Sequence, residues 1–465
     1  MGSVLWPQPA PAHAQITTTV QFDREIVHIL DNHCVMCHVE KGLTFPLVTY
    51  EQTYALRWKI RQDALDRHMP PWAAMPGDGD FANDNGLTQR EIDFLVSWAE
   101  SFGPRNNGEI YTGVAAMPSA RKIVRAHIDF DRWALGRPDL RLQLPENAAN
   151  PRNPDETTRT LIDPRLASDR WLRGLEYKPG DRRIVRAVSF AIQETGQWIG
   201  SWTPWHGFVS LPKGLAYRLP AGSHILADIR YRGSNEPATG QGTLGLYFAG
   251  QSSQRAVSTL VLEAKPALSS SAAAHKWVAT TRLAADTTIL ALQPELRPGV
   301  QSIEVAVRAP GGATQVLLFA KDIPMQWPTP YVFTTPVSLR KGTDLTVIEH
   351  YASDDAAAVA AIPVTFSAYQ GAPLTTGRRQ VQRLAPPTQH FKLAGTVKSV
   401  DAANGRLVVQ HDDIPGFMQA MTMSYEVRKP EELQAVRAGD TIQSDVVVSD
   451  TGSYLENIRV LGQKK

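Results

Sequence analysis

The feature of this sequence that most restricts its fold is a long stretch, from about residue 120 to 370, in which apolar and polar residues alternate. Ile303–Val307 is one clear example. A period of two places the apolar side chains on one face of a β-strand. Pairs such as Pro179-Gly180 and Gly311-Gly312 separate the alternating stretches and are typical of turns. The pattern predicts an all-β region made of two packed, jelly-roll-like β-sandwiches.

Residues 16–105 carry a helical pattern instead. Apolar residues recur at helical spacing near its start: Phe22, Ile26, Ile29 and Leu30. A second helix is expected over Tyr50–Arg67. A third begins where Thr88 and Glu91 form a capping box, and it ends before Gly103-Pro104. Short helices of this kind predict a small all-α domain.

Two stretches, residues 106–118 and 371–389, are predicted linkers, the second because it is rich in Pro, Thr, Arg and Gln. A compact β pattern returns over residues 390–465. Thr396–Val400 and Arg406–Gln410 are expected strands around a turn at Asn404-Gly405. About 75 residues suffice for a small five-stranded barrel.

Composition narrows the class of partner. Lys and Arg number 48 and Asp and Glu 46, which gives a formal net charge of +2 and no electrostatic reason to expect nucleic acid. No run approaches the ~20 apolar residues of a membrane-spanning helix. At the start, Ala12-His13-Ala14 before Gln15 has the small-residue pattern of a signal-peptidase site. We interpret residues 1–15 as a signal-peptide remnant.

The only two cysteines stand in Cys34-Val35-Met36-Cys37-His38. C-x-x-C-H is the attachment motif of c-type haem: two thiols add to the haem vinyl groups, and the following histidine binds the iron. A redox-active cysteine pair would be expected near a βαβ pattern, and a zinc site would need two further ligands. We therefore predict covalent haem c on Cys34 and Cys37, with His38 as proximal axial ligand.

The second axial ligand is predicted to be Met69, which lies among rigid prolines in His68-Met69-Pro70-Pro71-Trp72. A thioether ligand suits a low-spin, electron-transferring haem. His68 and Met75 are the rival ligands. The alternative for Met69 is an ordinary core position at a helix end.

Soft metal ligands gather near the other end of the chain, at His411, Met418, Met421 and Met423. Met421 and Met423 are two apart on an expected strand, so they share one face. Thioether sulfurs with one imidazole prefer Cu(I) to hard cations. The alternative is that a methionine pair simply fills a core.

Residues 391–462 resemble the CusF-type periplasmic copper-binding domain, a small OB-like barrel. The matching positions are Gly395, Val397, Asn404-Gly405, His411, Ile414-Pro415, Ala420-Met421-Thr422-Met423 and Ala438-Gly439-Asp440. The resemblance implies copper ligation by His411, Met421 and Met423. The tryptophan that covers copper in that family has no counterpart, since no tryptophan follows Trp327. Met418 is the candidate to take its place.

Residues 20–350 resemble copper type II, ascorbate-dependent monooxygenases that carry a c-type cytochrome domain in front. The matching positions are Phe45-Pro46-Leu47, Thr49-Tyr50, Met69-Pro70-Pro71-Trp72, Trp133, Gly136, Pro138-Asp139, Lys178-Pro179-Gly180, Leu211-Pro212, Gly214, Pro220-Ala221-Gly222-Ser223, Trp327 and Tyr331. The copper-binding histidines of that family are missing. Arg186, Arg230 and Glu295 lie in the matched stretches, and arginine has no lone pair for copper. The β-sandwich region over 120–370 is therefore expected to be non-catalytic.

Together these features predict an exported protein of the bacterial cell envelope, periplasmic in location, that couples electron transfer by haem c to the handling of Cu(I). Its expected partner is a redox protein or a copper-receiving protein. The alternative is an enzyme: an ascorbate-dependent copper monooxygenase that receives electrons from its haem.

Overall fold

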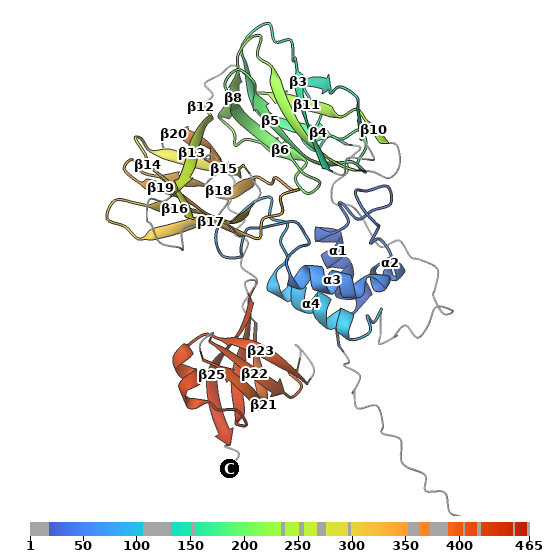
Figure 1. Cartoon of the computed structure of the whole chain (residues 1–465), viewed down its shortest axis with the longest axis vertical. Coiled ribbons are helices and arrows are strands. Elements are labelled where there is room, and N and C mark those ends of the chain that lie inside the picture. Colours follow the sequence, from blue (N-terminus) through green and yellow to red (C-terminus); the bar gives the residue numbers. More distant parts are fainter. Residues whose placement is uncertain are drawn as a thin grey trace, which may run out of the picture.

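The computed structural model describes most of the chain. The described residues are 18–105, 132–149, 155–233, 238–250, 255–266, 276–295, 299–351, 362–371, 389–402, 405–415, 420–449 and 452–462. The predictions for the signal-peptide remnant, for the linker at 106–118, for nearly all of the linker at 371–389 and for Met418 lie outside them. Figure 1 shows a helical part, two β units and a separate barrel.

The helical part contains one short π-helix and four α-helices. They are η1 (Phe22–Ile26), α1 (Val27–His33), α2 (Tyr50–Ala55), α3 (Arg57–Leu65) and α4 (Gln89–Glu100). The predicted apolar stripe is confirmed, because all four of its members are buried. The capping box at the start of α4 is confirmed as well, with the Glu91 N–H donating to Thr88 Oγ1 and the Thr88 N–H to Glu91 Oε2.

The single helix expected over Tyr50–Arg67 is wrong: the chain bends at Leu56, whose φ is −107° and ψ 9°. Because of this bend, α2 and α3 pack against different neighbours. In α2, Tyr50 packs edge-on against Phe22 at 5.1 Å and donates to Gly103 O at 2.8 Å. The second half, α3, packs against α4. None of the described helices is long and apolar enough to cross a membrane.

The first sandwich is built from two sheets that share one core. One sheet has the order β1 (Leu140–Gln143), β11 (Thr243–Phe248), β4 (Arg170–Lys178), β8 (Leu215–Leu219), β12 (Arg255–Ala256), with β7 (Phe208–Ser210) also on β4. The other has the order β3 (Asp155–Ile162), β9 (Ile225–Arg232), β5 (Val185–Ile192), β6 (Gln197–Trp202). A small pair joins β2 (Asn147–Ala149) to β10 (Ala238–Gly240).

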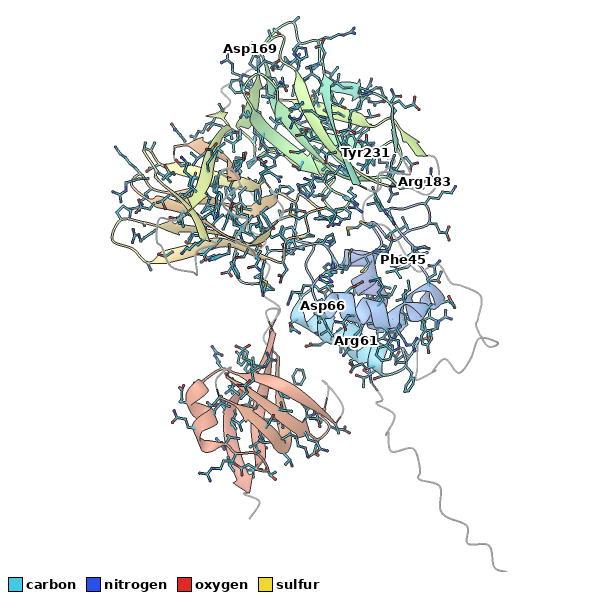
Figure 2. All side chains as sticks on the ribbon, viewed as in Figure 1. Phe45, Arg61, Asp66, Asp169, Arg183 and Tyr231 are labelled. Atoms are coloured by element: carbon cyan, nitrogen blue, oxygen red, sulfur yellow. The ribbon has the colours of Figure 1, made fainter. Side chains whose placement is uncertain are left out.

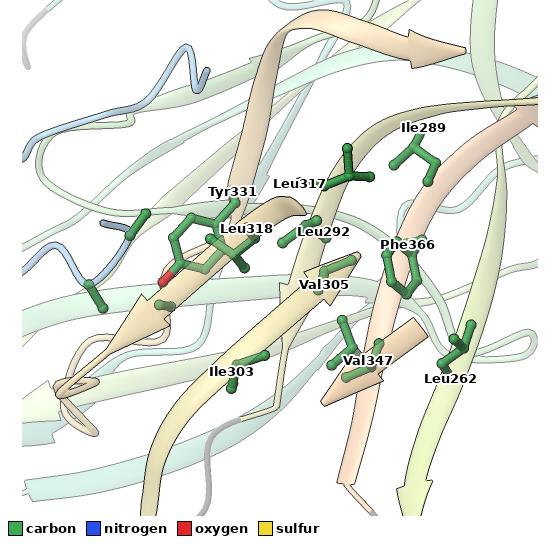
Figure 3. Packing of buried hydrophobic residues seen from close by; sticks show 14 of the residues in the cluster. Leu262, Ile289, Leu292, Ile303, Val305, Leu317, Leu318, Tyr331, Val347 and Phe366 are labelled. Carbon is green, nitrogen blue, oxygen red and sulfur yellow. The ribbon is translucent and has the colours of Figure 1, made fainter. Parts of the chain in front are cut away.

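The second sandwich consists of eight antiparallel strands in one continuous order. That order is β17 (Thr314–Lys321), β16 (Val300–Arg308), β19 (Asp344–Tyr351), β14 (Lys276–Arg282), β13 (Ser258–Pro266), β20 (Ile362–Gln370), β15 (Thr287–Pro294), β18 (Tyr331–Leu339). Apolar residues from both halves of this order meet in one core, among them Val305, Val347 and Phe366 (Figure 3). The mostly β architecture agrees with the prediction.

A strap from the helical part, residues 72–85, packs against the second sandwich. Ala74 bridges Ala320, and Phe81 bridges Phe333. The rings of Trp72 and Phe81 lie 5.2 Å and 5.3 Å from that of Tyr331, inside the core of the sandwich. Buried Asn83 adds two hydrogen bonds to the backbone just before and within β18. The stretch predicted as one helical domain therefore shares its core with strands more than 200 residues away.

The last unit is a closed five-stranded barrel, as predicted. Its order is β21 (Gln389–Asp401), β22 (Arg406–His411), β23 (Met421–Val427), β25 (Gly452–Gly462) and β24 (Thr441–Ser449), with the short helix η4 (Pro430–Ala435) after β23. The strands expected at Thr396–Val400 and Arg406–Gln410 lie within β21 and β22.

Candidate functional sites

The C-x-x-C-H stretch forms a tight turn at the end of α1. Cys34 is the C-cap, its N–H donating to Leu30 O, and the N–H groups of Cys37 and His38 both donate to Cys34 O, at 3.1 and 3.0 Å. Gly42 closes the loop behind it, since a Cβ there would come within 2.5 Å of Cys37 O. This turn brings both thiols and the imidazole to one region of the surface.

His38 is held in the form that binds a metal. Its Nδ1–H donates to Phe45 O at 2.9 Å, and the Phe45 ring lies 4.7 Å from the imidazole. Burial lowers the pKa of His38. A neutral ring that donates through Nδ1 keeps the lone pair of Nε2, and metal-ligating histidines commonly donate their other ring N–H in this way.

The two thiols do not resemble a reactive redox pair. Both cysteines are free, and burial raises the pKa of Cys34 and Cys37 to about 12. Redox-active pairs rely on a lowered thiol pKa. Among the residues that the structure describes, no three His, Cys, Asp or Glu side chains come together to hold a metal, which leaves the zinc alternative without support there.

A cavity of about 370 Å³ opens over this turn. Cys34, Cys37 and His38 line it, and so do His68 and Met69. The cavity lies in the range of roughly 300–1,000 Å³ usual for cofactor sites. Met69 is 42% exposed, so it is not a core residue. The rival Met75 does not line the cavity; it lies in the strap, where its N–H donates to Phe319 O of β17.

The wall opposite the cysteines comes from both β-sandwiches. Arg186 of β5 and Arg232 of β9 line the cavity, together with Gln326 and Trp327 from the loop before β18. The Arg186 guanidinium lies 5.9 Å from the Trp327 ring. The Trp205 ring packs against the same Trp327 ring, with 5.3 Å between the ring centres. The cavity is therefore completed at a junction of three parts of the chain.

His33 also lines the cavity, and it forms a partly buried ion pair with Glu91. Its Nδ1–H donates to Asn85 O at 3.2 Å and its Nε2–H to Glu91 Oε1 at 3.1 Å. Burial lowers the pKa of His33, but the bond and charge of Glu91 outweigh it, so the net shift is upward. The pKa of Glu91 is lowered: burial opposes this, and His33 and Thr88 overcome it. The pair ties α1 to α4.

Two histidines of the sandwiches, His224 and His350, have structural partners. His224 Nδ1 lies 2.8 Å from Glu194, and His350 Nδ1 lies 3.2 Å from Ser302 Oγ. Of the arginines in the matched monooxygenase stretches, Arg230 donates to Met325 O at 2.7 Å, which anchors the loop before Trp327.

In the barrel, His411 ends β22 and is 1% exposed. Its Nδ1–H donates to Asp412 O at 2.8 Å, while its buried Nε2 has no hydrogen-bond partner among the described residues. Burial lowers the pKa of His411, which favours the neutral ring. A buried nitrogen without a partner costs free energy unless something binds it. The lone pair of Nε2 is therefore left without a hydrogen-bond donor among the described residues.

Two of the predicted methionines, Met421 and Met423, lie on β23, the strand that pairs with the strand of His411. His411 is directly opposite Met421 in the β22–β23 ladder, and Met423 is opposite Val409. Directly paired positions share a face of the sheet. The close pairing of β21 with His411 requires glycine at position 395, because a Cβ there would come within 2.6 Å of the His411 Cα. For Met421 and Met423 the structure describes the backbone only.

Comparison with known proteins found similarity over the barrel. Residues 390–460 match the family of copper binding periplasmic protein CusF. Solved structures of CusF from Escherichia coli are similar to the same part. The apo form is 22% identical, covers 19% of this chain and 100% of its own, and has a TM-score of 0.15. The Ag(I) form is 24% identical, covers 16% and 95%, and has a TM-score of 0.15. Comparison with curated proteins gave no match.

The CusF match covers the barrel that carries His411, Met421 and Met423, and it leaves the haem motif and the sandwiches to be argued from their own residues. The residues of the cavity wall opposite the cysteines were not predicted from the sequence: Arg186, Arg232, Gln326 and Trp327. Their only sequence signal was that Arg186 and Trp327 fell in stretches matched to the monooxygenases.

Proposed function

We propose that this protein is an exported haem c and copper protein that couples single-electron transfer to the handling of Cu(I). Haem c is bound by Cys34 and Cys37, with His38 and Met69 as axial ligands. Cu(I) is bound by His411, Met421 and Met423, with Met418 as a further thioether. The periplasm is the proposed location, since the CusF family is described as periplasmic, and a redox or copper-receiving protein is the proposed partner.

The observation that carries the haem half is the cavity in which Cys34, Cys37, His38 and Met69 meet. The donor set fits the group: two thiols for the vinyl groups, a neutral imidazole with a free Nε2, and a thioether on the cavity wall. When bound, haem with histidine and methionine ligands carries single electrons. The residues of the chain hold and orient it, and Phe45 O fixes the ring of His38.

The copper half is supported by the CusF match together with the buried, unpartnered Nε2 of His411. Imidazole and thioethers are soft enough to prefer Cu(I). The sandwiches are proposed to act as spacer and as part of the haem cavity. Since Arg186, Arg230 and Glu295 lie in the stretches where the monooxygenases carry copper-binding histidines, we include no hydroxylation step.

The haem half is tested by expression with export and c-type haem maturation, followed by absorbance spectra in both redox states. We expect covalent haem in the wild type and none in Cys34→Ser/Cys37→Ser. Met69→Ala is expected to abolish the low-spin spectrum, whereas His68→Ala leaves it unchanged. A wild type without covalent haem, matured beside a cytochrome that is loaded, contradicts the proposal.

The copper half is tested by titration of the mature protein with Cu(I) against a competing chelator. We expect one tightly bound Cu(I), lost in His411→Ala and retained in His390→Ala, which removes an exposed imidazole from the same barrel. Oxygen consumption with ascorbate addresses the enzyme alternative. Robust turnover that survives His411→Ala would favour a monooxygenase over copper handling.

A further inference from the structure

The haem cavity has a cationic wall that belongs to a different unit from the haem motif. Arg186 and Arg232 come from neighbouring antiparallel strands of the first sandwich, β5 and β9, at the end that lies toward the helical part. In Figure 2 the labelled residues Arg183 and Tyr231 mark this end of the sandwich, and Phe45 lies on the helical part that it approaches. Both arginines are half-buried.

A β-bulge directs Arg186 to this position. Along β5, Val185 pairs with Tyr231 and Ala187 pairs with Arg230, so Arg186 is the extra residue that the ladder skips. Bulges re-aim a side chain and recur beside functional sites. Arg232 follows at the end of β9, where its N–H donates to Ile184 O at 2.6 Å. The two strands thus present both guanidinium groups to one cavity.

The electrostatics agree with this placement. Arg186 and Arg232 line the same cavity as His38. Other side chains of the cavity wall are ion-paired: Lys59 and Asp63 pair with each other at 2.8 Å, and His33 pairs with Glu91. Arg186 and Arg232 therefore place two guanidinium groups on the wall opposite the cysteines.

This inference rests on the proposed haem. We propose that the first sandwich supplies Arg186 and Arg232 as the binding groups for the two carboxylates of the haem, its propionates. The thioether bonds and the axial ligands hold the porphyrin from the helical part, and they leave the carboxylates to be accommodated elsewhere. Carboxylates that leave water need charged donors, and arginine offers two parallel N–H groups for each. The haem is then clamped between two units.

The clamp predicts a change in redox balance when it is removed. Without the guanidinium groups, the negative charge of the propionates is less compensated, and the ferric state is favoured over the ferrous. We expect Arg186→Gln/Arg232→Gln to shift the ferric-to-ferrous ratio at a given potential roughly tenfold toward ferric, which lowers the midpoint potential by about 59 mV. Arg186→Lys/Arg232→Lys keeps the charge and is expected to stay within threefold of the wild type. Arg218→Gln is the control, because Arg218 pairs with Asp169 at the far end of the same sandwich (Figure 2).

A second measurement tests the clamp without redox chemistry. Hydrogen exchange of the full-length protein is compared between the haem-loaded wild type and the haem-free Cys34→Ser/Cys37→Ser. We expect slower exchange in the loaded form at residues 184–188 and 231–233, and equal exchange around Arg218. If the wild type carries haem but the glutamine pair leaves the potential unchanged and exchange at β5 and β9 does not respond, the clamp is refuted while the proposed function stands. A wild type without covalent haem refutes both.

Discussion

Replacing His411 by leucine distinguishes a metal ligand from a structural histidine. In the metal-free barrel the substitution removes a buried Nε2 without a partner, a relief of about 1–3 kcal/mol. It also removes the bond from Nδ1 to Asp412 O, a loss of about 0.5–1.5 kcal/mol. The balance lies between about 0.5 kcal/mol lost and about 2.5 kcal/mol gained. If His411 is a metal ligand, the apo barrel of His411→Leu should therefore be about as stable as the wild-type apo barrel, or more stable.

Hydrogen exchange in the full-length protein measures this locally. The amides of Leu407 and Val409, both buried in β22, report the free energy of opening the barrel. Cu(I) at a hundredfold excess over its dissociation constant is expected to add about 2.7 kcal/mol in the wild type and far less in His411→Leu. His390→Leu is the matched control and should keep the full copper effect. An apo barrel destabilised by more than about 2 kcal/mol in His411→Leu would refute the reasoning, because the imidazole would then be a satisfied core residue.

Three further predictions concern the helical part. Glu91→Gln keeps the capping box but removes the ion pair with His33. Because the pKa of His33 is raised, the stabilisation that the ion pair gives is complete below pH 6.5 and is lost as pH rises through the raised pKa. Because the pKa of Glu91 is lowered, the same stabilisation is complete above pH 4.5 and is lost as pH falls through the lowered pKa. Denaturant titrations should therefore show a deficit of about 1–2 kcal/mol that is largest between pH 4.5 and 6.5, and a deficit independent of pH would contradict the assignment. Asn83→Ala removes the partner of the buried Pro330 carbonyl and of the partly buried Val332 N–H, at up to about 1–3 kcal/mol each. Hydrogen exchange should then rise in β18 and in the strap. Unchanged protection would show that the strap is held by its apolar residues alone. Gly42→Ala places a Cβ against Cys37 O, so the yield of covalent haem should fall several-fold by haem staining, whereas Gly250→Ala, which meets no atom within 4 Å, should not change it.

Features encoded in a few consecutive residues were predictable from the sequence. The capping box of α4 depends on Thr88 and Glu91 alone. The closed barrel followed from short strands and one turn signal. In each case the physical cause is local, so it is visible in a short window of the chain.

What could not be predicted depends on register and on contacts between distant parts. The bulge that directs Arg186 exists only in the pairing of β5 with β9. Trp327 reaches the cavity because Arg230 anchors the preceding loop. The bend at Leu56 follows from two different packing partners rather than from a helix breaker. No window of residues contains these causes.

The strap has a consequence for any attempt to isolate the helical part. Trp72 and Phe81 leave that part to enter the core of the second sandwich beside Tyr331. A fragment that ends at residue 105 would expose these two aromatic rings to solvent. The remaining chain would have a cavity in the core of the second sandwich where the rings pack. Each buried aromatic ring is worth roughly 1.5–3 kcal/mol. Both pieces should therefore be prone to aggregation when expressed apart, and their co-expression should restore solubility.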